Sequence, residues 1–316
     1  MERISTTNAV RHIIVQSSVC LYREKTVVLL SGLFVVLVLV SAYLGWSATS
    51  TVNSIYADAV IYLQSSGQQV PPNPVQELSP LSLMRNMSIY VSLIGVLASI
   101  VIGYQLIASD RKSGILPLLG ARPIERRAYV FGKILALMAV NGGLLIMAAA
   151  VSVVTFLILP NVVLNSIGWI KLFSFFILSY GYMVLFGLLA IAAAASSRSE
   201  SVGLLLPVTI WLAITFILPS LTGNIHPTAS INPISALASP PNSTFFHWTG
   251  WLVGPFSISE SFKYLSADLL DFLPTSAVVH SIVPPLPDLI LAFVGAGTLA
   301  IRAMLRMDMT RGDFDV

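Results

Sequence analysis

Residues 110–133, with the sequence DRKSGILPLLGARPIERRAYVFGK, form a short polar stretch between two long apolar segments. The stretch holds six of the seventeen lysine and arginine residues of the chain. Because most of the remaining chain is apolar, it is the largest basic surface that the chain offers to a soluble partner. Its place between two apolar runs predicts a loop on the cytoplasmic side of a membrane.

The composition excludes an ordinary soluble domain. Of the 316 residues, 56% are hydrophobic and 10% are charged, and the mean hydropathy is +0.85. Soluble domains carry about 25% charged residues. The basic residues cluster beside apolar segments, as membrane topology requires, which argues against binding of nucleic acid. The single cysteine, Cys20, excludes a disulfide within the chain.

The apolar runs predict an all-α polytopic membrane protein with six transmembrane helices. Apolar residues at helical spacing in residues 1–26 favour an amphipathic elbow helix on the cytoplasmic leaflet, and the alternative is a frayed tail. A transmembrane domain is expected over residues 27–308, followed by a cytoplasmic tail at 309–316. Its spans are expected at about 27–46, 89–108, 128–159, 169–195, 202–221 and 289–305, with outer loops at 47–87 and 222–288 and a short helix at 257–272.

Basic residues beside the spans predict the orientation of the chain. With both termini in the cytoplasm, only Arg85, Lys171 and Lys263 of the seventeen basic residues lie outside. This distribution is a strong positive-inside signal, and six spans satisfy it.

No motif in the chain indicates chemistry of its own. No carboxylate or histidine lies centrally in a span, which argues against an ion-driven carrier. The chain has neither a phosphate-binding loop of the form GxxxxGK[ST] nor an HExxH motif. His226, His247 and His280 share the second outer loop, but their spacing does not favour a metal site. Neutral residues within the spans, such as Asn141, are interpreted as packing contacts. Any energy that the protein uses is therefore expected from elsewhere.

Residues 110–133 themselves predict a short exposed helix. Gly114 is suited to its start, Pro117 to its first turn and Pro123 to its end. Apolar residues then form an exposed face, ringed by basic ones: Ile115, Leu116, Leu118 and Leu119, with Arg111, Lys112, Arg122, Arg126 and Arg127. Such a helix fits a cleft on a soluble partner. The alternative is a re-entrant hairpin with basic anchors, and the residues alone leave both open.

The stretch resembles the loop between the second and third spans of ABC-2 type exporter permeases. The matching positions are Asp110, Gly114, Leu116, Leu118, Leu119, Arg122-Pro123, Arg126 or Arg127, and Gly132-Lys133. Ile115 stands where threonine is frequent, and Pro117 is unusual. An elbow helix, six spans and a large outer loop before the last span extend the resemblance over most of the chain.

The resemblance implies a type V exporter-like fold and a non-enzymatic permease subunit in a prokaryotic cell membrane. In the family the loop is a coupling helix that docks on a separate dimeric ABC ATPase, which binds ATP and Mg²⁺. Two permease copies form the unit, and this chain needs no cofactor or metal. The implied coupling residues are Asp110, Arg111, Lys112, Gly114, Ile115, Leu116, Leu118, Leu119, Arg122, Pro123, Arg126 and Arg127.

Two other hypotheses remain open. The Pro-Pro-Asn-Pro run at 71–74 and Asn232-Pro233 resemble permeases that serve multicopper-enzyme and nitrous oxide reductase maturation. In that case the chain transmits motion to an extracytoplasmic protein through residues 222–288 and transports nothing itself. A membrane anchor or enzyme without an ATPase is the third hypothesis.

Overall fold

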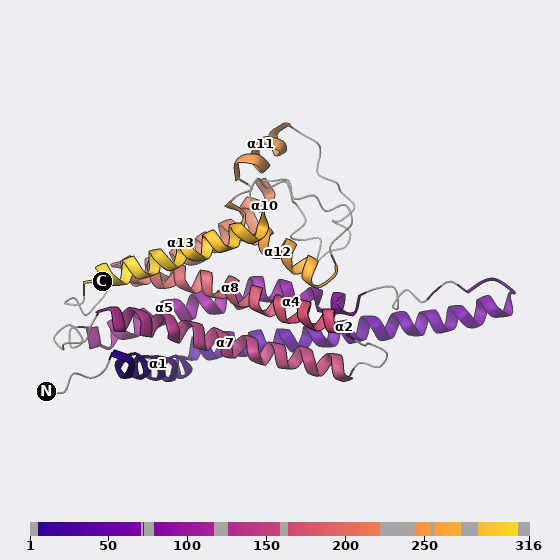
Figure 1. Ribbon diagram of the computed structural model, residues 1–316, viewed down its shortest axis with the longest axis horizontal. Coiled ribbons are helices and arrows are strands. Elements are labelled where there is room, and N and C mark those ends of the chain that lie inside the picture. Colours follow the sequence, from indigo (N-terminus) through magenta and orange to yellow (C-terminus); the bar gives the residue numbers. More distant parts are fainter. Residues whose placement is uncertain are drawn as a thin grey trace.

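The computed structural model describes residues 6–70, 72, 79–116, 126–158, 164–221, 244–253, 256–272 and 284–308. Within these ranges the regular structure is helical, and six helices are long and apolar enough to cross a membrane. Most of them run side by side along the long axis of the molecule (Figure 1). The all-α, six-span prediction is therefore confirmed.

The first two helices are separated by a single residue. α1 (Thr6–Arg23) is amphipathic and packs on α7, α2 and α5, and α2 (Lys25–Ser65) follows after Glu24. α2 contains 41 residues, which corresponds to a length of roughly 60 Å. The bilayer core is about 30 Å thick. α2 consequently extends far past the other long helices at one end of the molecule (Figure 1).

The continuous α2 corrects the prediction of a first span at 27–46 followed by a loop from residue 47. Residues 47–65 are polar enough to suggest a loop, but they contain neither glycine nor proline. Without a helix breaker, the backbone hydrogen bonds continue to Ser65.

The second membrane-length helix, Pro80–Lys112, consists of four continuous segments. These are η1 (Pro80–Met84), α4 (Arg85–Tyr90), the π-helical turn η2 (Val91–Gly95) and α5 (Val96–Lys112). The other membrane-length helices are α7 (Arg126–Ile158), α8 (Ser166–Ser196), α9 (Glu200–Leu212) with the π-helical turn η3 (Ala213–Ile217), and α13 (Pro285–Arg306). A short α10 (Leu218–Leu221) follows η3.

α8 is the centre of the bundle and packs against α5, α7, α9, α12 and α13. It approaches α5 closely, because a Cβ added to Gly103 would lie 2.3 Å from the carbonyl oxygen of Gly187. Beside this contact, Asn141 Nδ2 donates to Ser99 Oγ (3.0 Å), and Ser99 Oγ donates to the carbonyl oxygen of Met183 (2.7 Å). Asn141 of α7 is thus hydrogen-bonded to α5, which agrees with the expectation that it serves helix packing.

Two further helices lie near the end from which α2 extends. They are α11 (Thr244–Val253) and α12 (Ile258–Leu269), and α12 corresponds to the short helix predicted at 257–272. The ring of Phe262 in α12 stacks on Tyr182 with centroids 4.1 Å apart, and Ser261 Oγ donates to Asp288 Oδ2 (2.7 Å). α12 is thus attached to both α8 and α13.

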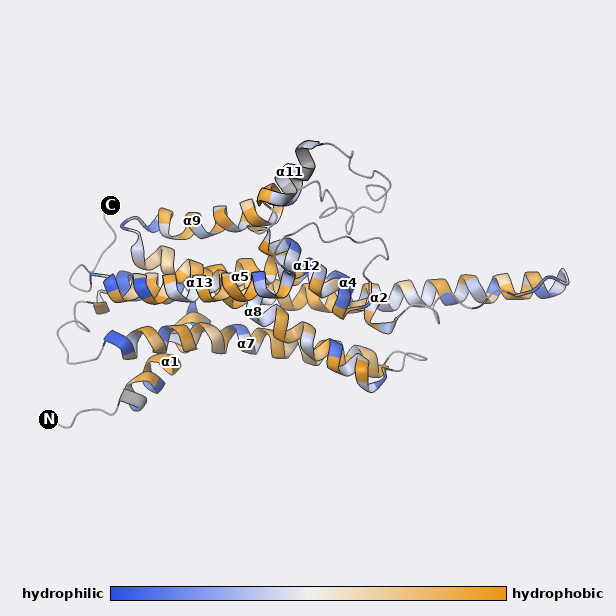
Figure 2. Cartoon of the chain, turned by 45° about the horizontal axis from the view of Figure 1, so that its top comes forward, coloured by the Kyte–Doolittle hydropathy of each residue, from blue (hydrophilic) through white to orange (hydrophobic). Residues whose placement is uncertain are grey.

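The opposite end carries most of the basic residues. The start of α1, the ends of α5 and α13 and the start of α7 lie together there (Figure 1). Hydrophilic colour marks the ends of the long helices, this end among them, whereas the middle of the helices is largely hydrophobic (Figure 2).

Candidate functional site

The predicted coupling loop begins at the end of α5. α5 ends at Lys112, and Gly114 adopts a φ of 64°, a conformation that favours glycine. Ile115 and Leu116 follow in helical conformation, and α7 begins at Arg126. Of the predicted site, Leu118, Leu119, Arg122 and Pro123 lie outside the described residues.

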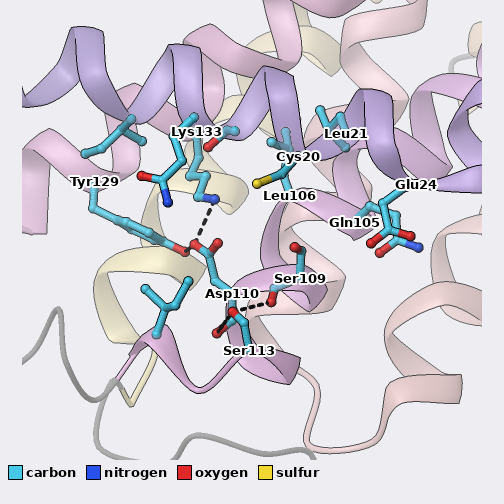
Figure 3. Close-up of a pocket in the computed structure, with 14 residues that line it drawn as sticks. Cys20, Leu21, Glu24, Gln105, Leu106, Ser109, Asp110, Ser113, Tyr129 and Lys133 are labelled. Atoms are coloured by element: carbon cyan, nitrogen blue, oxygen red, sulfur yellow. Dashed lines mark hydrogen bonds and ion pairs between the residues drawn. The ribbon is translucent and has the colours of Figure 1, made fainter.

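A buried ion pair joins the two ends of this loop. Lys133 Nζ of α7 lies 2.7 Å from Asp110 Oδ2 of α5, and the side chain of Lys133 is only 5% exposed. The hydroxyl of Tyr129 donates to the same carboxylate oxygen (2.8 Å), and Figure 3 shows the three side chains converging. Asp110 is only partly buried, with a side chain that is 16% exposed, whereas its cationic partner is buried. The ion pair and the hydrogen bond together fix the position of this carboxylate, and loss of Lys133 would remove its charge partner.

Arg111 joins α5 to the far end of α8. Its guanidinium group donates to the carbonyl oxygens of Ser197 (2.6 Å) and Ala195 (3.0 Å). The next residue, Lys112, forms an ion pair with Glu200 at the start of α9. One turn of α5 therefore contacts α7, the end of α8 and the start of α9.

Two predicted exposures are wrong. Arg111 is buried at 9% exposure, so it is not part of an exposed basic collar. Leu116 is completely buried, whereas the sequence predicted an exposed apolar face that includes it. Arg111 is taken up by its hydrogen bonds to the end of α8, and Leu116 packs into the apolar core of the bundle.

The remaining described site residues are more accessible. Lys112, Gly114, Arg126 and Arg127 are exposed, and Ile115 is half-buried. Arg126 Nη1 also donates to the carbonyl oxygen of Leu305 near the end of α13 (3.2 Å). The exposed basic surface described at this end is thus smaller than predicted.

α1 covers the ion pair from the side. A cavity of about 140 Å³ is lined by residues of α1, α5 and α7, and Figure 3 shows Asp110, Tyr129 and Lys133 on its wall. Beside it, a Cβ added to Gly132 would lie 2.6 Å from Cγ2 of Ile13. Gly132 therefore permits α1 to approach α7 directly next to Lys133.

Sequence reasoning missed Tyr129 and Glu200 as members of the site, and it matched Lys133 to the family motif without including it among the coupling residues. Tyr129 and Lys133 are four residues apart on one helix and so share a face, which is a usable signal. Glu200 carried no such signal, because its pairing with Lys112 depends on how α9 packs beside α5.

The sequence matches the family of ABC-2 family transporter proteins over residues 21–269, which is most of the chain. The chain belongs to the ABC-2 transporter family. No curated protein matches it. It is therefore a multi-pass membrane protein of a transporter family whose members act as permease subunits with an ABC ATPase and are generally not catalytic themselves.

The match covers the candidate site and α12 but does not distinguish a subgroup. The likeness of residues 71–74 and Asn232-Pro233 to maturation permeases remains a prediction, and both segments include residues outside the described ranges. Among the described residues, no group of three or more His, Cys, Asp or Glu side chains is placed to hold a metal ion.

Proposed function

We propose that this ABC-2 permease receives the motion of a separate ATPase dimer at the junction of α5 and α7. The observation that carries the proposal is the contact between the predicted coupling loop and the bundle. Both ends of the loop are fixed to one another by Asp110 and Lys133, and Arg111 fixes the same turn to α8. A displacement of the loop therefore moves several helices together.

α8 distributes that displacement through the membrane domain. It packs along α5 at the close contact of Gly103 with Gly187 and also contacts α7, α9 and α13. Closure of the ATPase dimer around ATP and Mg²⁺ shifts the loop, and the spans of two permease copies rearrange about their interface. This is rigid-element coupling of the kind used in domain closure.

The proposed orientation places this junction in the cytoplasm of a prokaryotic cell. Lys112, Arg126 and Arg127 lie there, with Arg302 and Arg306 on the last turns of α13. Lysine and arginine beside short cytoplasmic loops set topology. The exposed apolar residues Val15 and Val19 of α1 suit contact with lipid at the same surface.

A second function is favoured by the outer end of the molecule. Trp248 and Trp251 of α11 are exposed, and α12 forms a folded surface attached to Tyr182 and Asp288. The alternative is that the chain transmits motion to an extracytoplasmic protein through residues 222–288 without transporting a substrate.

Affinity purification in mild detergent tests the main proposal. Wild type is expected to retain an ABC ATPase subunit, and the double variant Leu118→Asp/Leu119→Asp is expected to lose it. Ile61→Asp is the matched control, because Ile61 is exposed at the opposite end of the molecule. If the double variant keeps the ATPase, the contact is elsewhere. If wild type binds no ATPase, the coupling proposal fails.

A further inference from the structure

The cavity between α1, α5 and α7 has a second side, which the coupling contacts do not use. Figure 3 shows Glu24 and Gln105 together on one side of the view, and Tyr129 and Lys133 on the other. The cavity measures about 140 Å³. Since a water molecule takes up about 30 Å³ in the liquid, the cavity has room for a group of several heavy atoms.

Two polar side chains on this wall have no partner within the described part of the chain. Ser17 of α1 is buried at 6% exposure, and its hydroxyl forms no hydrogen bond with a described residue. Glu24, the half-buried residue between α1 and α2, forms no ion pair with a described residue. A buried hydroxyl without a partner costs free energy. Ser17 and Glu24 therefore point to a polar group that enters the cavity.

The charges on the wall select a cation. Asp110 and Lys133 neutralise one another, so Glu24 leaves one negative charge on the wall. Among the described residues no group of three or more His, Cys, Asp or Glu side chains is placed to hold a metal ion. A primary ammonium group carries a positive charge and three hydrogen-bond donors, which suits carboxylate and hydroxyl acceptors.

A quaternary ammonium group fits this wall less well. It donates no hydrogen bond, and proteins bind it in cages of aromatic side chains. Tyr129 is the one aromatic residue among the described residues that line the cavity. The lining therefore distinguishes a primary from a quaternary ammonium group.

Glu24 lies at the edge of the membrane. The apolar run of α2 begins at residue 27 and continues to residue 46, a length of about 20 residues that spans the hydrocarbon core. Glu24 precedes this run directly and so lies at the level of the lipid headgroups. Arg23 and Lys25, on either side of it, are both exposed. A carboxylate between two cations complements a headgroup that carries an ammonium and a phosphate.

We propose that the cavity binds the headgroup of a phospholipid that ends in a primary ammonium group, as in phosphatidylethanolamine. The ammonium group lies between Glu24 and Ser17, and the phosphate lies near Arg23 or Lys25. A free amine shares the ammonium chemistry but has no phosphate for these two cations. The inference goes beyond the coupling function and requires only that α2 crosses the membrane.

The bound headgroup links α1 to the helices of the coupling site. α1 packs on α7 and α5, and the cavity wall includes Asp110 and Lys133. A ligand held from α1 on this wall therefore determines how firmly α1 stays on the ion pair. The amount of such a lipid in the surrounding leaflet would regulate the junction of α5 and α7.

Native mass spectrometry of the purified full-length protein tests the inference. The protein is offered equal amounts of phosphatidylethanolamine and phosphatidylcholine with the same acyl chains. Wild type is expected to retain the former on the order of tenfold better, as for one hydrogen bond to a charged group. Glu24→Gln should lose this preference, and Ser17→Ala should weaken it. Asp58→Asn is the matched control, because Asp58 is an exposed carboxylate far along α2.

The single cysteine of the chain reports where the lipid binds. Cys20 is exposed and lines the cavity, so it needs no engineered substitution. A maleimide should label Cys20 of wild type more slowly in micelles with phosphatidylethanolamine than in micelles with phosphatidylcholine. In Glu24→Gln the two rates should be equal. Thermal unfolding in phosphatidylcholine should show that this variant is as stable as wild type.

The contrary results overturn different parts of the inference. Equal retention of both lipids by wild type shows that the cavity does not select a primary ammonium group. A preference that survives in Glu24→Gln, or an unchanged labelling rate of Cys20, shows that the lipid binds elsewhere. If free ethanolamine displaces the lipid, a soluble amine is the ligand. None of these measurements involves the ATPase, so their failure leaves the coupling proposal untouched.

Discussion

At the scale of single residues, the coupling site depends on the buried pair of Asp110 and Lys133. Lys133→Met should lower the stability of the protein by about 3 kcal/mol, the lower end for breaking a buried ion pair, because it leaves the partly buried Asp110 carboxylate without its cation and with the Tyr129 hydrogen bond. Thermal unfolding in detergent measures the effect.

The double variant Asp110→Asn/Lys133→Met separates pairing from burial. It removes both charges, so it should recover much of the lost stability. If the double variant loses as much stability as the two single variants lose together, the two side chains do not interact directly.

A second residue-scale prediction concerns the contact between α5 and α8. Gly103→Ala should cost about 1–3 kcal/mol, because its Cβ would lie 2.3 Å from a backbone oxygen of Gly187 and force the helices apart. Gly143→Ala is the matched control, since no heavy atom lies within 4 Å of the added Cβ. The control should be neutral or slightly stabilising. Melting temperatures of both variants test the contact, and equal values would refute it.

Sequence patterns identified the position of the site but not its internal contacts. Asp110 and Gly132-Lys133 stand out as motif residues, yet the burial of Arg111 is decided by carbonyl groups of α8, 84 and 86 residues further along the chain. Leu116 is apolar whether it faces a partner or a neighbouring helix. Pattern alone cannot distinguish these two environments, because both exclude water.

At the scale of elements, the end of α12 is held by a strained residue. Asp271 has a φ of 54°, and its carboxylate accepts from Lys171 Nζ (2.5 Å) and Ser79 Oγ (2.8 Å). Asp271→Ala loses these contacts and also suffers the cost of a positive φ, whereas Asp271→Gly loses only the contacts. The glycine variant should therefore be more stable than the alanine variant by about 1 kcal/mol. Thermal unfolding compares the two variants. A glycine variant less stable than the alanine variant would contradict backbone strain at position 271.

The helices themselves were largely readable from the sequence. Long apolar runs predicted six spans, since only hydrogen-bonded helices satisfy the backbone in lipid. Residues 47–65 of α2 escaped prediction as a helix because their polar side chains resemble a loop, and the informative signal was the absence of glycine and proline between Trp46 and Gly67. Polarity indicates where a membrane ends, whereas helix breakers indicate where a helix ends.

At the scale of the whole molecule, the two ends have different connections to the bundle. The end that holds Asp110 and Arg111 is bound to α5, α7 and α8 by polar contacts, whereas α2 beyond Thr49 contributes none of the buried residues of that helix. The bundle should thus fold without the part of α2 beyond Thr49.

Replacement of residues 52–68 by a short Gly/Ser linker tests this expectation. The melting temperature should change little, because the buried row Phe34 to Gly45 and its covering helix remain intact. Co-purification of the ATPase should also persist, since the coupling site lies at the other end. A large fall in melting temperature would show instead that residues 52–68 support the bundle.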